Sequence, residues 1–365
     1  MQIAYYITAH GYGHGVRSCD ILAALFKAHP GVRITVTTDL PESFLRNRVP
    51  CEGLTLRQGA FDVGMVQMDS IRVDVEATLA QALQLIENRP ALIQAEAEFL
   101  RELRADLVVV DIPSIPIEAA KRVGIPAVAV GNFSWDWIYS PFVERDERWR
   151  AVIELFEEGY RQASLLLKLP FSPAMEIFSK QVELPLLAQP GQSRREDIAA
   201  MTGADPAKQW VLLSFTTLEW DEAALQKVEA LTEYEFFTVM PLAWSNHRNI
   251  HAVDRAQVGF PSVLASADIV LTKPGFGILS ECVVNQKPMV YAEREDFIEY
   301  PLLERELKRV LRNVHIPATD LYAGRLGPAL AAVATASAPA ETLEGGGAEM
   351  VAAILMNRCE GISTS

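Results

Sequence analysis

The sequence predicts an α/β protein with two domains, each built around a parallel β-sheet. Short apolar runs alternate with amphipathic segments from the N-terminus to about residue 170, which is typical of strand–helix–strand units with right-handed crossovers. The same alternation starts again at Trp210. The length of 365 residues suits two or three domains of roughly 150 residues each. The pattern is interrupted between Leu187 and Ala207, so we divide the chain into residues 1–190 and 191–345.

In the first predicted domain, strands are expected where apolar and β-branched residues run together, as in buried parallel strands. These strands are Ile3–Thr8, Val32–Thr37, Asp106–Asp111 and Ala127–Val130. The helical spacing of apolar residues predicts helices over His14–His29, Ala77–Arg104 and Ile117–Val123. Because proline has no amide hydrogen to donate, Pro90 is expected to interrupt the second of these segments, which then forms one or two helices.

The second predicted domain begins with a capping-box pattern, in which Ser193 is followed by Glu196. In this pattern the serine caps the helix and the glutamate bonds back to it, so a helix is expected from Ser193 to about Gly203. Further helices are expected after Gly277 and after Pro301, and a final one over Ala348–Cys359. The strands expected here are Trp210–Phe215, Phe236–Val239, Ile269–Thr272 and Pro288–Tyr291.

The overall charge and the cysteines exclude several classes of protein. With 33 Lys and Arg against 47 Asp and Glu, the formal net charge is −14, whereas nucleic-acid binding needs a basic surface. No run of about 18 apolar residues is present, so no transmembrane segment is expected, and the N-terminus lacks the pattern of a signal peptide. The cysteines are widely spaced without a CxxC pair, which indicates neither a zinc ribbon nor a disulfide framework and favours a cytoplasmic location.

A glycine-rich segment, Thr8–Gly15, joins the first strand to the first helix. Gly11 and Gly13 let the backbone approach a ligand, and the helix N-terminus that follows offers amide donors to an anionic or polar group. The spacing departs from the dinucleotide-binding pattern GxGxxG, because Val16 stands where its third glycine would be. His14 is a candidate general base, since a helix N-terminus keeps an imidazole neutral near pH 7. The alternative is a histidine that only caps the helix or packs in the loop.

Two further residues of this loop and helix bear on the site. Arg17 lies one turn beyond His14 and either binds an anion or forms a surface ion pair. His10 lies four residues before His14 but in the loop, so an HxxxH metal site is not expected. No third metal ligand is evident, and we expect no metal here.

The second predicted domain contains a loop of the same strand–loop–helix form, Leu271–Glu281. Gly275 and Gly277 open the helix at a position where phosphate or diphosphate binds, and Lys273 adds a positive charge. Glu281 lies about one turn into that helix, where a carboxylate can accept two hydrogen bonds from a ribose. The alternative is a tight turn with a solvated glutamate. The P-loop pattern GxxxxGK[ST] is absent.

Acidic residues follow the strand Pro288–Tyr291, within the stretch Glu293–Pro301. Carboxylates at the carboxyl end of a parallel strand point toward the ligand crevice of an α/β sheet, where they can hold sugar hydroxyls. A solvated acidic loop is the alternative.

Three segments resemble the GT-B glycosyltransferases, and among them the glycosyltransferase-like N-terminal region of L-arabinokinases and its stand-alone bacterial relatives. These segments are Tyr5–His14, Gly131–Tyr139 and Lys273–Glu281. The resemblance implies the GT-B fold, in which two Rossmann-like domains face each other across a cleft. It implies that the first domain holds the acceptor and the second the nucleotide-sugar donor, and that the last helix, 348–360, crosses back to the first domain. The kinase half is absent, since no GHMP-type phosphate loop is present.

The resemblance also implies roles for individual residues. Gly275 and Gly277 match the diphosphate-binding positions, Glu281 the ribose position and Glu299 the donor-sugar position. His14 matches the histidine that is a candidate base in inverting members. The other donor-binding candidates are Gly11, Gly13, Ser214, Thr216, Thr217, Lys273, Phe276 and Ser280.

One segment departs from the pattern of the relatives. They carry a glycine-rich turn after the first strand of the second domain, where this chain has Ser214-Phe215-Thr216-Thr217. Hydroxyl groups can bind phosphate oxygens, but the close approach of the backbone is in doubt. Donor binding is therefore expected either to rely on these hydroxyls or to be altered.

The first functional hypothesis is an inverting glycosyltransferase that uses a nucleotide-diphosphate sugar, UDP-linked, and needs no metal or bound cofactor. The acceptor is a small molecule or a lipid-linked one that the sequence does not identify. Asp111 and Asp136 are secondary catalytic candidates that orient His14 or bind the acceptor, and each is equally a candidate loop cap. The aromatic stretch Phe133–Phe142 either lines an acceptor site or packs in the core.

Two alternatives use the same scaffold. The first-loop pattern is also similar to that of a nucleotide-sugar hydrolase of pseudaminic acid synthesis, in which water replaces the acceptor. A non-catalytic module that binds sugar nucleotides is the other alternative, motivated by the missing glycines at 214–217. A Rossmann oxidoreductase is disfavoured, because the dinucleotide pattern is imperfect and no acidic residue follows it at a suitable distance.

Overall fold

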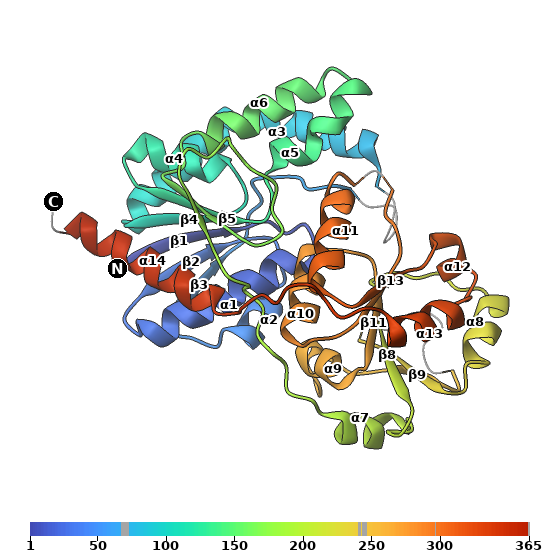
Figure 1. The fold of residues 1–365 in the computed structure, drawn as a ribbon. Coiled ribbons are helices and arrows are strands. Elements are labelled where there is room, and N and C mark those ends of the chain that lie inside the picture. The colour runs from blue at the N-terminus through green and yellow to red at the C-terminus, as the bar shows by residue number, and fades with distance from the viewer. Residues whose placement is uncertain (67–72, 240–241, 243–246, 296, 364–365) are drawn as a thin grey trace. The chain divides into compact units, whose positions relative to one another are not determined.

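The computed structural model describes residues 1–66, 73–239, 242, 247–295 and 297–363 of the chain (Figure 1). These residues form two compact units. Unit 1 comprises the described residues of 1–66, 74–188 and 345–365, and unit 2 comprises those of 67–73 and 189–344. Each unit has its own parallel sheet with helices, so the predicted α/β fold class is confirmed.

The sheet of unit 1 has the strand order β3-β2-β1-β4-β5-β6-β7, and every pairing in it is parallel. Its strands are β1 (Gln2–Ile7), β2 (Arg33–Thr37), β3 (Leu54–Arg57), β4 (Leu107–Asp111), β5 (Ala127–Gly131), β6 (Leu165–Lys168) and β7 (Gln181–Glu183). The strands predicted here are present, with ends shifted by a residue or less. The order reverses between β1 and β4, and in this class of sheet ligands bind outside the carboxyl ends at such a switch point.

Helices cover both faces of this sheet, with α1, α2 and α14 on one face and α3, α4 and α6 on the other (Figure 1). They are α1 (Tyr12–Ala28), α2 (Glu42–Arg48), α3 (Val75–Leu103), α4 (Ile115–Val123), α5 (Trp135–Tyr139), α6 (Trp149–Tyr160) and α14 (Gly347–Ser363), with a 3-10 turn at Ser140–Glu144. The apolar side of α14, with Val351 and Leu355, packs in one core with Ile21 and Leu22 of α1. The C-terminal helix is therefore part of unit 1 although the chain reaches it from unit 2.

The predicted interruption at Pro90 is wrong, because α3 continues through it from Val75 to Leu103. Pro90 is exposed, and its neighbour Arg89 fixes this part of the helix to the two helices beside it. The Arg89 guanidinium donates to Glu118 of α4 at 3.1 and 2.5 Å and to Glu158 of α6 at 2.5 Å. Tertiary packing of this kind outweighs the loss of one backbone hydrogen bond.

The sheet of unit 2 has the order β10-β9-β8-β11-β12-β13, again with parallel pairing throughout. Its strands are β8 (Gln209–Ser214), β9 (Tyr234–Thr238), β10 (Ile250–Ala252), β11 (Ile269–Thr272), β12 (Met289–Tyr291) and β13 (Asn313–His315). Its helices are α7 (Arg195–Thr202), α8 (Glu222–Glu229), α9 (Phe260–Ser266), α10 (Phe276–Val284), α11 (Glu299–Val310), α12 (Ala318–Tyr322) and α13 (Gly327–Thr335). The order reverses between β8 and β11, which is the switch point of this sheet.

The predicted capping box at the start of α7 is wrong. The helix begins at Arg195, and its N-cap residue Arg194 provides no side-chain cap. The Ser193 hydroxyl is instead turned toward Ser266, whose Oγ accepts the Arg194 amide at 2.8 Å. A contact with a distant helix thus replaces the local cap. The predicted end of the helix is confirmed, since Gly203 is its C-cap with φ of 77°.

Membrane-spanning helices, metal-ligand clusters and cysteine pairing can be checked in the described residues. No helix in the described part of the chain is long and apolar enough to cross a bilayer. Within the same residues, no group of three or more His, Cys, Asp or Glu side chains is arranged to hold a metal ion. Cys19, Cys51 and Cys282 are free thiols. The side chain of Cys359 and the whole of Asp296 lie outside the described residues.

Candidate functional site

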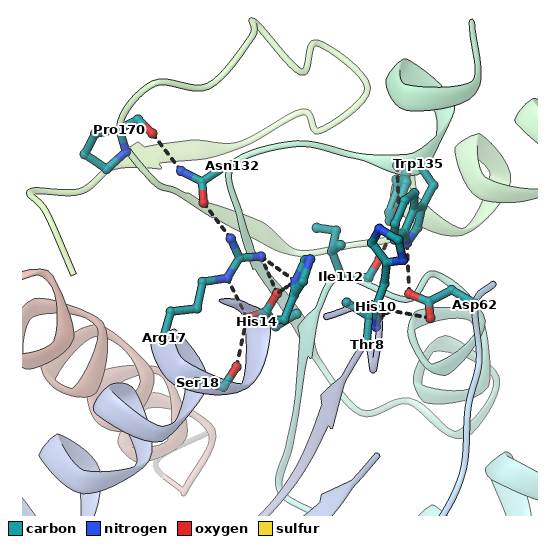
Figure 2. Close-up of polar contacts among 12 residues, drawn as sticks. Thr8, His10, His14, Arg17, Ser18, Asp62, Ile112, Asn132, Trp135 and Pro170 are labelled. Atoms are coloured by element: carbon teal, nitrogen blue, oxygen red, sulfur yellow. Dashed lines mark hydrogen bonds and ion pairs between the residues drawn. The ribbon is translucent and has the colours of Figure 1, made fainter. Parts of the chain in front are cut away.

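His14 and Asp111 meet at the switch point of the unit 1 sheet. The N-cap of α1 is Gly11, whose φ of 78° suits glycine and turns the chain from β1 into the helix, so that His14 lies in its first turn. Asp111 is the last residue of β4 and is paired with Ile7 of β1. Figure 2 shows the side chains of His14 and Arg17 projecting from α1 toward this point.

Asp111 is a buried, ionised carboxylate. Its side chain has no exposed surface, and it accepts hydrogen bonds from Arg17 Nε at 2.7 Å and Ser18 Oγ at 2.8 Å on Oδ2. Arg17 Nη2 makes a further short contact with Oδ1. Burial by itself raises the pKa of Asp111, but the charges and hydrogen bonds of Arg17 and His14 outweigh burial and hold it well below its usual range. The carboxylate therefore acts only as an acceptor near neutral pH.

His14 is a buried, neutral imidazole that contacts both members of the Asp111–Arg17 ion pair. Its Nδ1 lies 2.7 Å from Asp111 Oδ1, which only accepts, and 2.8 Å from Arg17 Nη2, which only donates. Burial and the charge of Arg17 lower the pKa of His14 and outweigh the opposing effect of Asp111. Nε2 has no hydrogen-bond partner in the described part of the chain, and it keeps its lone pair in the tautomer that donates Nδ1–H to Asp111. A neutral histidine held in this way can take a proton at Nε2.

Arg17 matches neither of the roles considered for it from the sequence. Its side chain is 13% exposed, so it is neither a surface ion pair nor an open anion ligand but the buried counter-ion of Asp111. Nη1 donates to Asn132 Oδ1 at 2.5 Å, and Asn132 Nδ2 donates to the Pro170 carbonyl at 2.7 Å (Figure 2). The motif 131–139 thus supplies a residue that anchors the charge network of the first glycine loop.

A second carboxylate, Asp62, lies in this region and had no sequence signal. It accepts hydrogen bonds from Thr8 Oγ1 and Trp135 Nε1, each at 2.8 Å (Figure 2). Burial raises its pKa to about 6, and the two hydrogen bonds oppose this rise. The His10 ring meets the edge of Trp135 and its Nδ1 accepts the Met65 amide at 3.2 Å, which gives His10 a structural role in the loop.

Asp136, the other catalytic candidate, is not part of the His14 cluster. It lies on α5, and among the described residues no hydrogen bond or ion pair joins it to His14 or Arg17. Burial raises its pKa, the reverse of the shift at Asp111. The stretch Phe133–Phe142 is mostly core: Phe133 packs against both His14 and Trp135, and Trp135 stacks on Tyr139. The packing alternative therefore describes most of this stretch.

The second glycine loop lies at the switch point of the unit 2 sheet. Ser214 ends β8 and pairs with Thr272 at the end of β11, and Thr272 Oγ1 donates to the Ser214 carbonyl at 2.9 Å. Thr216 and Thr217 follow Ser214 and are exposed. The segments around Ser214–Thr217 and Lys273–Gly277 are thus neighbours at the edge where an α/β sheet binds its ligand.

The start of α10 has an exposed glycine and an N-cap residue without a side chain. Its N-cap is Gly275, which has no side chain to cap the first amides. Gly277 is exposed, and a Cβ atom built on it would meet nothing within 4 Å. Gly15 of the first loop is the opposite case, because its Cβ would lie 2.6 Å from Leu40 Cδ1. Packing thus explains Gly15, whereas no packing contact excludes a side chain at Gly277.

The remaining donor-binding candidates differ in what they can offer a ligand. Ser280 donates its hydroxyl to the Phe276 carbonyl at 2.9 Å, and Phe276 is itself buried. Lys273 and Glu281 are half-buried on either side of the loop. Gly11 and Gly13 belong to unit 1, whereas the other donor-binding candidates belong to unit 2.

Glu299 and Arg294 form a buried pair close to this loop. Glu299 is the first residue of α11, and its side chain is 15% exposed. Burial raises its pKa, against the opposing charges of Arg294 and Lys273. Arg294, which the sequence did not single out, follows β12 and has a side chain that is 8% exposed. Nη1 of Arg294 lies 3.9 Å from Glu299 Oε2, an ion pair without a hydrogen bond.

The described residues have the fold of the GT-B glycosyltransferases. Residues 1–148 match the family model described as Glycosyl transferase family 1. A solved glycotransferase of kitacinnamycin matches with a TM-score of 0.66 and 18% identity, over 98% of this chain and 99% of that one. Medicago truncatula UGT71G1, solved with UDP-glucose, matches with a TM-score of 0.64 and 11% identity over 98% of both chains.

A particular relative is the L-arabinokinase of Arabidopsis thaliana. It is 28% identical over 335 residues, which make up 90% of this chain. The chain spans about a third of that protein's length, since the match covers 32% of it. The resemblance inferred from the three motifs is therefore confirmed.

Proposed function

We propose that this protein is an inverting glycosyltransferase that moves a sugar from a nucleotide-diphosphate donor, UDP-linked, to a hydroxyl group of a small-molecule or lipid-linked acceptor. The observation that carries the proposal is the neutral His14, whose Nδ1 is oriented by the ionised Asp111 at the switch point of its sheet. The fold supports it, as do solved neighbours with UDP-glucose and with dTDP.

The geometry of the His14–Asp111 pair accounts for the chemical step. His14 Nε2 takes the proton from the acceptor hydroxyl while the oxygen attacks the anomeric carbon of the donor sugar. The bond from that carbon to the diphosphate breaks, and the nucleoside diphosphate leaves with the electron pair. Attack opposite the leaving group inverts the anomeric configuration. Asp111 stabilises the imidazolium that forms, because its charge lies 2.7 Å from Nδ1.

In unit 2 the proposed donor site uses fixed positive potential rather than a metal. The N-terminus of α10 and the Lys273 ammonium face the leaving diphosphate, which such groups stabilise without reorganisation. Glu281 holds the ribose and Glu299 a hydroxyl of the sugar. The exposed hydroxyls of Thr216 and Thr217 supply further donors to phosphate oxygens.

The role of His14 as the base is tested by the variant His14→Ala. The control is His29→Ala, which alters a histidine at the other end of the same helix. Removal of the base is expected to lower kcat/KM by about 10²- to 10⁴-fold while UDP affinity stays within a factor of two. His29→Ala is expected to behave as the wild type. Products are followed by mass spectrometry across a panel of donors and acceptors. Full turnover by His14→Ala would remove this residue from the mechanism.

The same panel separates the proposal from its alternatives. Release of free sugar at the full rate without any acceptor would identify a nucleotide-sugar hydrolase, in which water is the nucleophile. Tight binding of nucleotide without turnover of any donor would identify a binding module. We also keep a cytoplasmic location as part of the proposal, supported by the free thiols of Cys19, Cys51 and Cys282.

A further inference from the structure

Arg294 is a buried cation whose hydrogen-bonding capacity is not satisfied by the residues that the structure describes. Its side chain is 8% exposed, and its Nε atom is buried without a hydrogen-bond partner among them. A buried guanidinium ordinarily has both hydrogen bonds and a close counter-ion, because desolvating a charge is costly. Here the counter-ion is Glu299, which stays at 3.9 Å. Burial accordingly lowers the pKa of Arg294 to about 10.

The neighbours of the Arg294 guanidinium show which of its edges has room for a hydrogen-bond acceptor. Glu299 lies at the Nη1 end, and the face of the guanidinium lies 3.2 Å from the ring centre of Phe297. Nε, which forms the other edge together with Nη2, has no hydrogen-bond partner in the described part of the chain. Arginine uses this edge for two parallel hydrogen bonds to a carboxylate. Arg89 does so in this chain, where Nε and Nη2 bind the two oxygens of Glu118.

Arg294 follows a strand that neighbours the proposed donor loop. β12 pairs with β11, and Thr272, which precedes Lys273, is paired with Tyr291, three residues before Arg294. The positive charges of Arg294 and Lys273 both lower the pKa of Glu299, so we treat these three side chains as one charge cluster. The diphosphate candidates follow β11, and Arg294 follows the next strand along. An anionic group bound by Arg294 is therefore one strand removed from the diphosphate, on the side of Glu299.

We propose that the Nε–Nη2 edge of Arg294 binds a carboxylate on the donor sugar, so that the preferred donor is a nucleotide-linked hexuronate. This inference rests on the proposed donor site in unit 2. A planar carboxylate satisfies both nitrogens at once, and Phe297 holds the guanidinium flat for that geometry. Glu299, at the other end of Arg294, accepts a sugar hydroxyl. A neutral sugar leaves the open edge of Arg294 unpaired and is bound less tightly.

The test compares UDP, UDP-glucose and UDP-glucuronate by isothermal titration calorimetry on the full chain. We expect the wild type to bind UDP-glucuronate at least ten-fold more tightly than UDP-glucose. Arg294→Met removes the charge but keeps the length of the side chain and its contact with Phe297. This variant is expected to weaken the binding of UDP-glucuronate by about 10- to 100-fold and to leave the affinities for UDP and UDP-glucose within two-fold of the wild type. Arg312→Met, which alters an exposed arginine of the same unit, is the matched control.

Each outcome has a distinct meaning. Equal weakening of all three ligands by Arg294→Met would assign Arg294 to the diphosphate and overturn the hexuronate inference, as would no weakening at all. Failure of the wild type to bind any of the three would instead refute the proposed donor site, and this inference with it. Arg294→Lys keeps the charge without the paired edge and should bind UDP-glucuronate with intermediate affinity. If Arg294→Met does not fold, a wild-type affinity of Arg294→Lys for UDP-glucuronate overturns the proposal.

Discussion

Replacement of Asp111 by asparagine tests the charge network of the first glycine loop. The asparagine side chain would have the same shape but no charge, and its amide would place N–H donors against the N–H donors of Arg17 and His14. Arg17, which is 13% exposed, would lose its counter-ion. Breaking a buried ion pair from one side costs about 3–5 kcal/mol, because the remaining charge is left uncompensated. For a domain of roughly 200 residues this corresponds to a fall in melting temperature of about 6–20 °C.

The pH dependence of this loss follows from the direction of the pKa shift. The folded-state pKa of Asp111 is depressed, so the carboxylate contributes its full stability above its unfolded value of about 3.9. That contribution is lost as pH falls from there through the folded pKa. The difference in unfolding free energy between wild type and Asp111→Asn is therefore expected to be constant from pH 7 to pH 5. Below about pH 4 it should shrink.

Urea denaturation at pH 7, 5 and 3.5 measures this difference. Asp136→Asn is the matched control, because burial raises the pKa of Asp136, and removal of its charge should cost nothing at pH 7. The double variant Asp111→Asn/Arg17→Met should recover part of the loss, since it leaves no unpaired charge. Equal urea midpoints for wild type and Asp111→Asn at pH 7 would refute the view of Asp111 as an ionised, charge-paired carboxylate.

Three further variants address other parts of the chain. Asp62 has a pKa raised to about 6, so its protonated form contributes stability at low pH that is lost as pH rises through 6. Urea midpoints should therefore show the wild type losing stability relative to Asp62→Asn between pH 4 and 7. A difference that stays constant over this range contradicts the prediction. Gly277→Ala should keep or raise the melting temperature, because its Cβ meets nothing within 4 Å, yet weaken UDP at least ten-fold in calorimetry if diphosphate occupies that space. Pro90→Ala should raise the unfolding free energy by about 1–3 kcal/mol in urea, since it restores an amide donor to an exposed turn of α3, and no gain would show that the proline is accommodated without cost.

The strands and helices that the sequence predicted share strong local patterns. Continuous apolar runs identified the central strands of both sheets, including β1, β4, β8 and β11. The strands that were missed include β3, β7, β10 and β13, which lie at or near the sheet edges and are three or four residues long. Such segments become strands by pairing with a neighbour, and a run that short carries little periodicity of its own.

The two element errors have the same origin. Pro90 and the Ser193–Glu196 pair are local signals, and each was overruled by contacts from far along the chain. Arg89 binds α4 and α6 beside Pro90, and the Ser193 hydroxyl is turned toward Ser266 instead of capping the amides of α7. Local propensities of about 1 kcal/mol for a cap, or about 3 kcal/mol for an interior proline, are small enough for packing to reverse.

Local sequence patterns were enough to predict the alternation of strands and helices, the two glycine loops that open helices, and His14 as a candidate base. Which carboxylate contacts His14 depends on how the strands pair. Asp111 and Asp136 were equal candidates along the chain, but the pairing of β1 with β4 places Asp111 against His14 and Arg17. Burial raises the pKa of both carboxyls, but the charge and hydrogen bonds of Arg17 reverse this at Asp111, whereas at Asp136 the effect of burial prevails. Asp62 and Arg294 could not be found from the sequence for the same reason, because a charge acquires its chemistry from the groups that the fold brings near it.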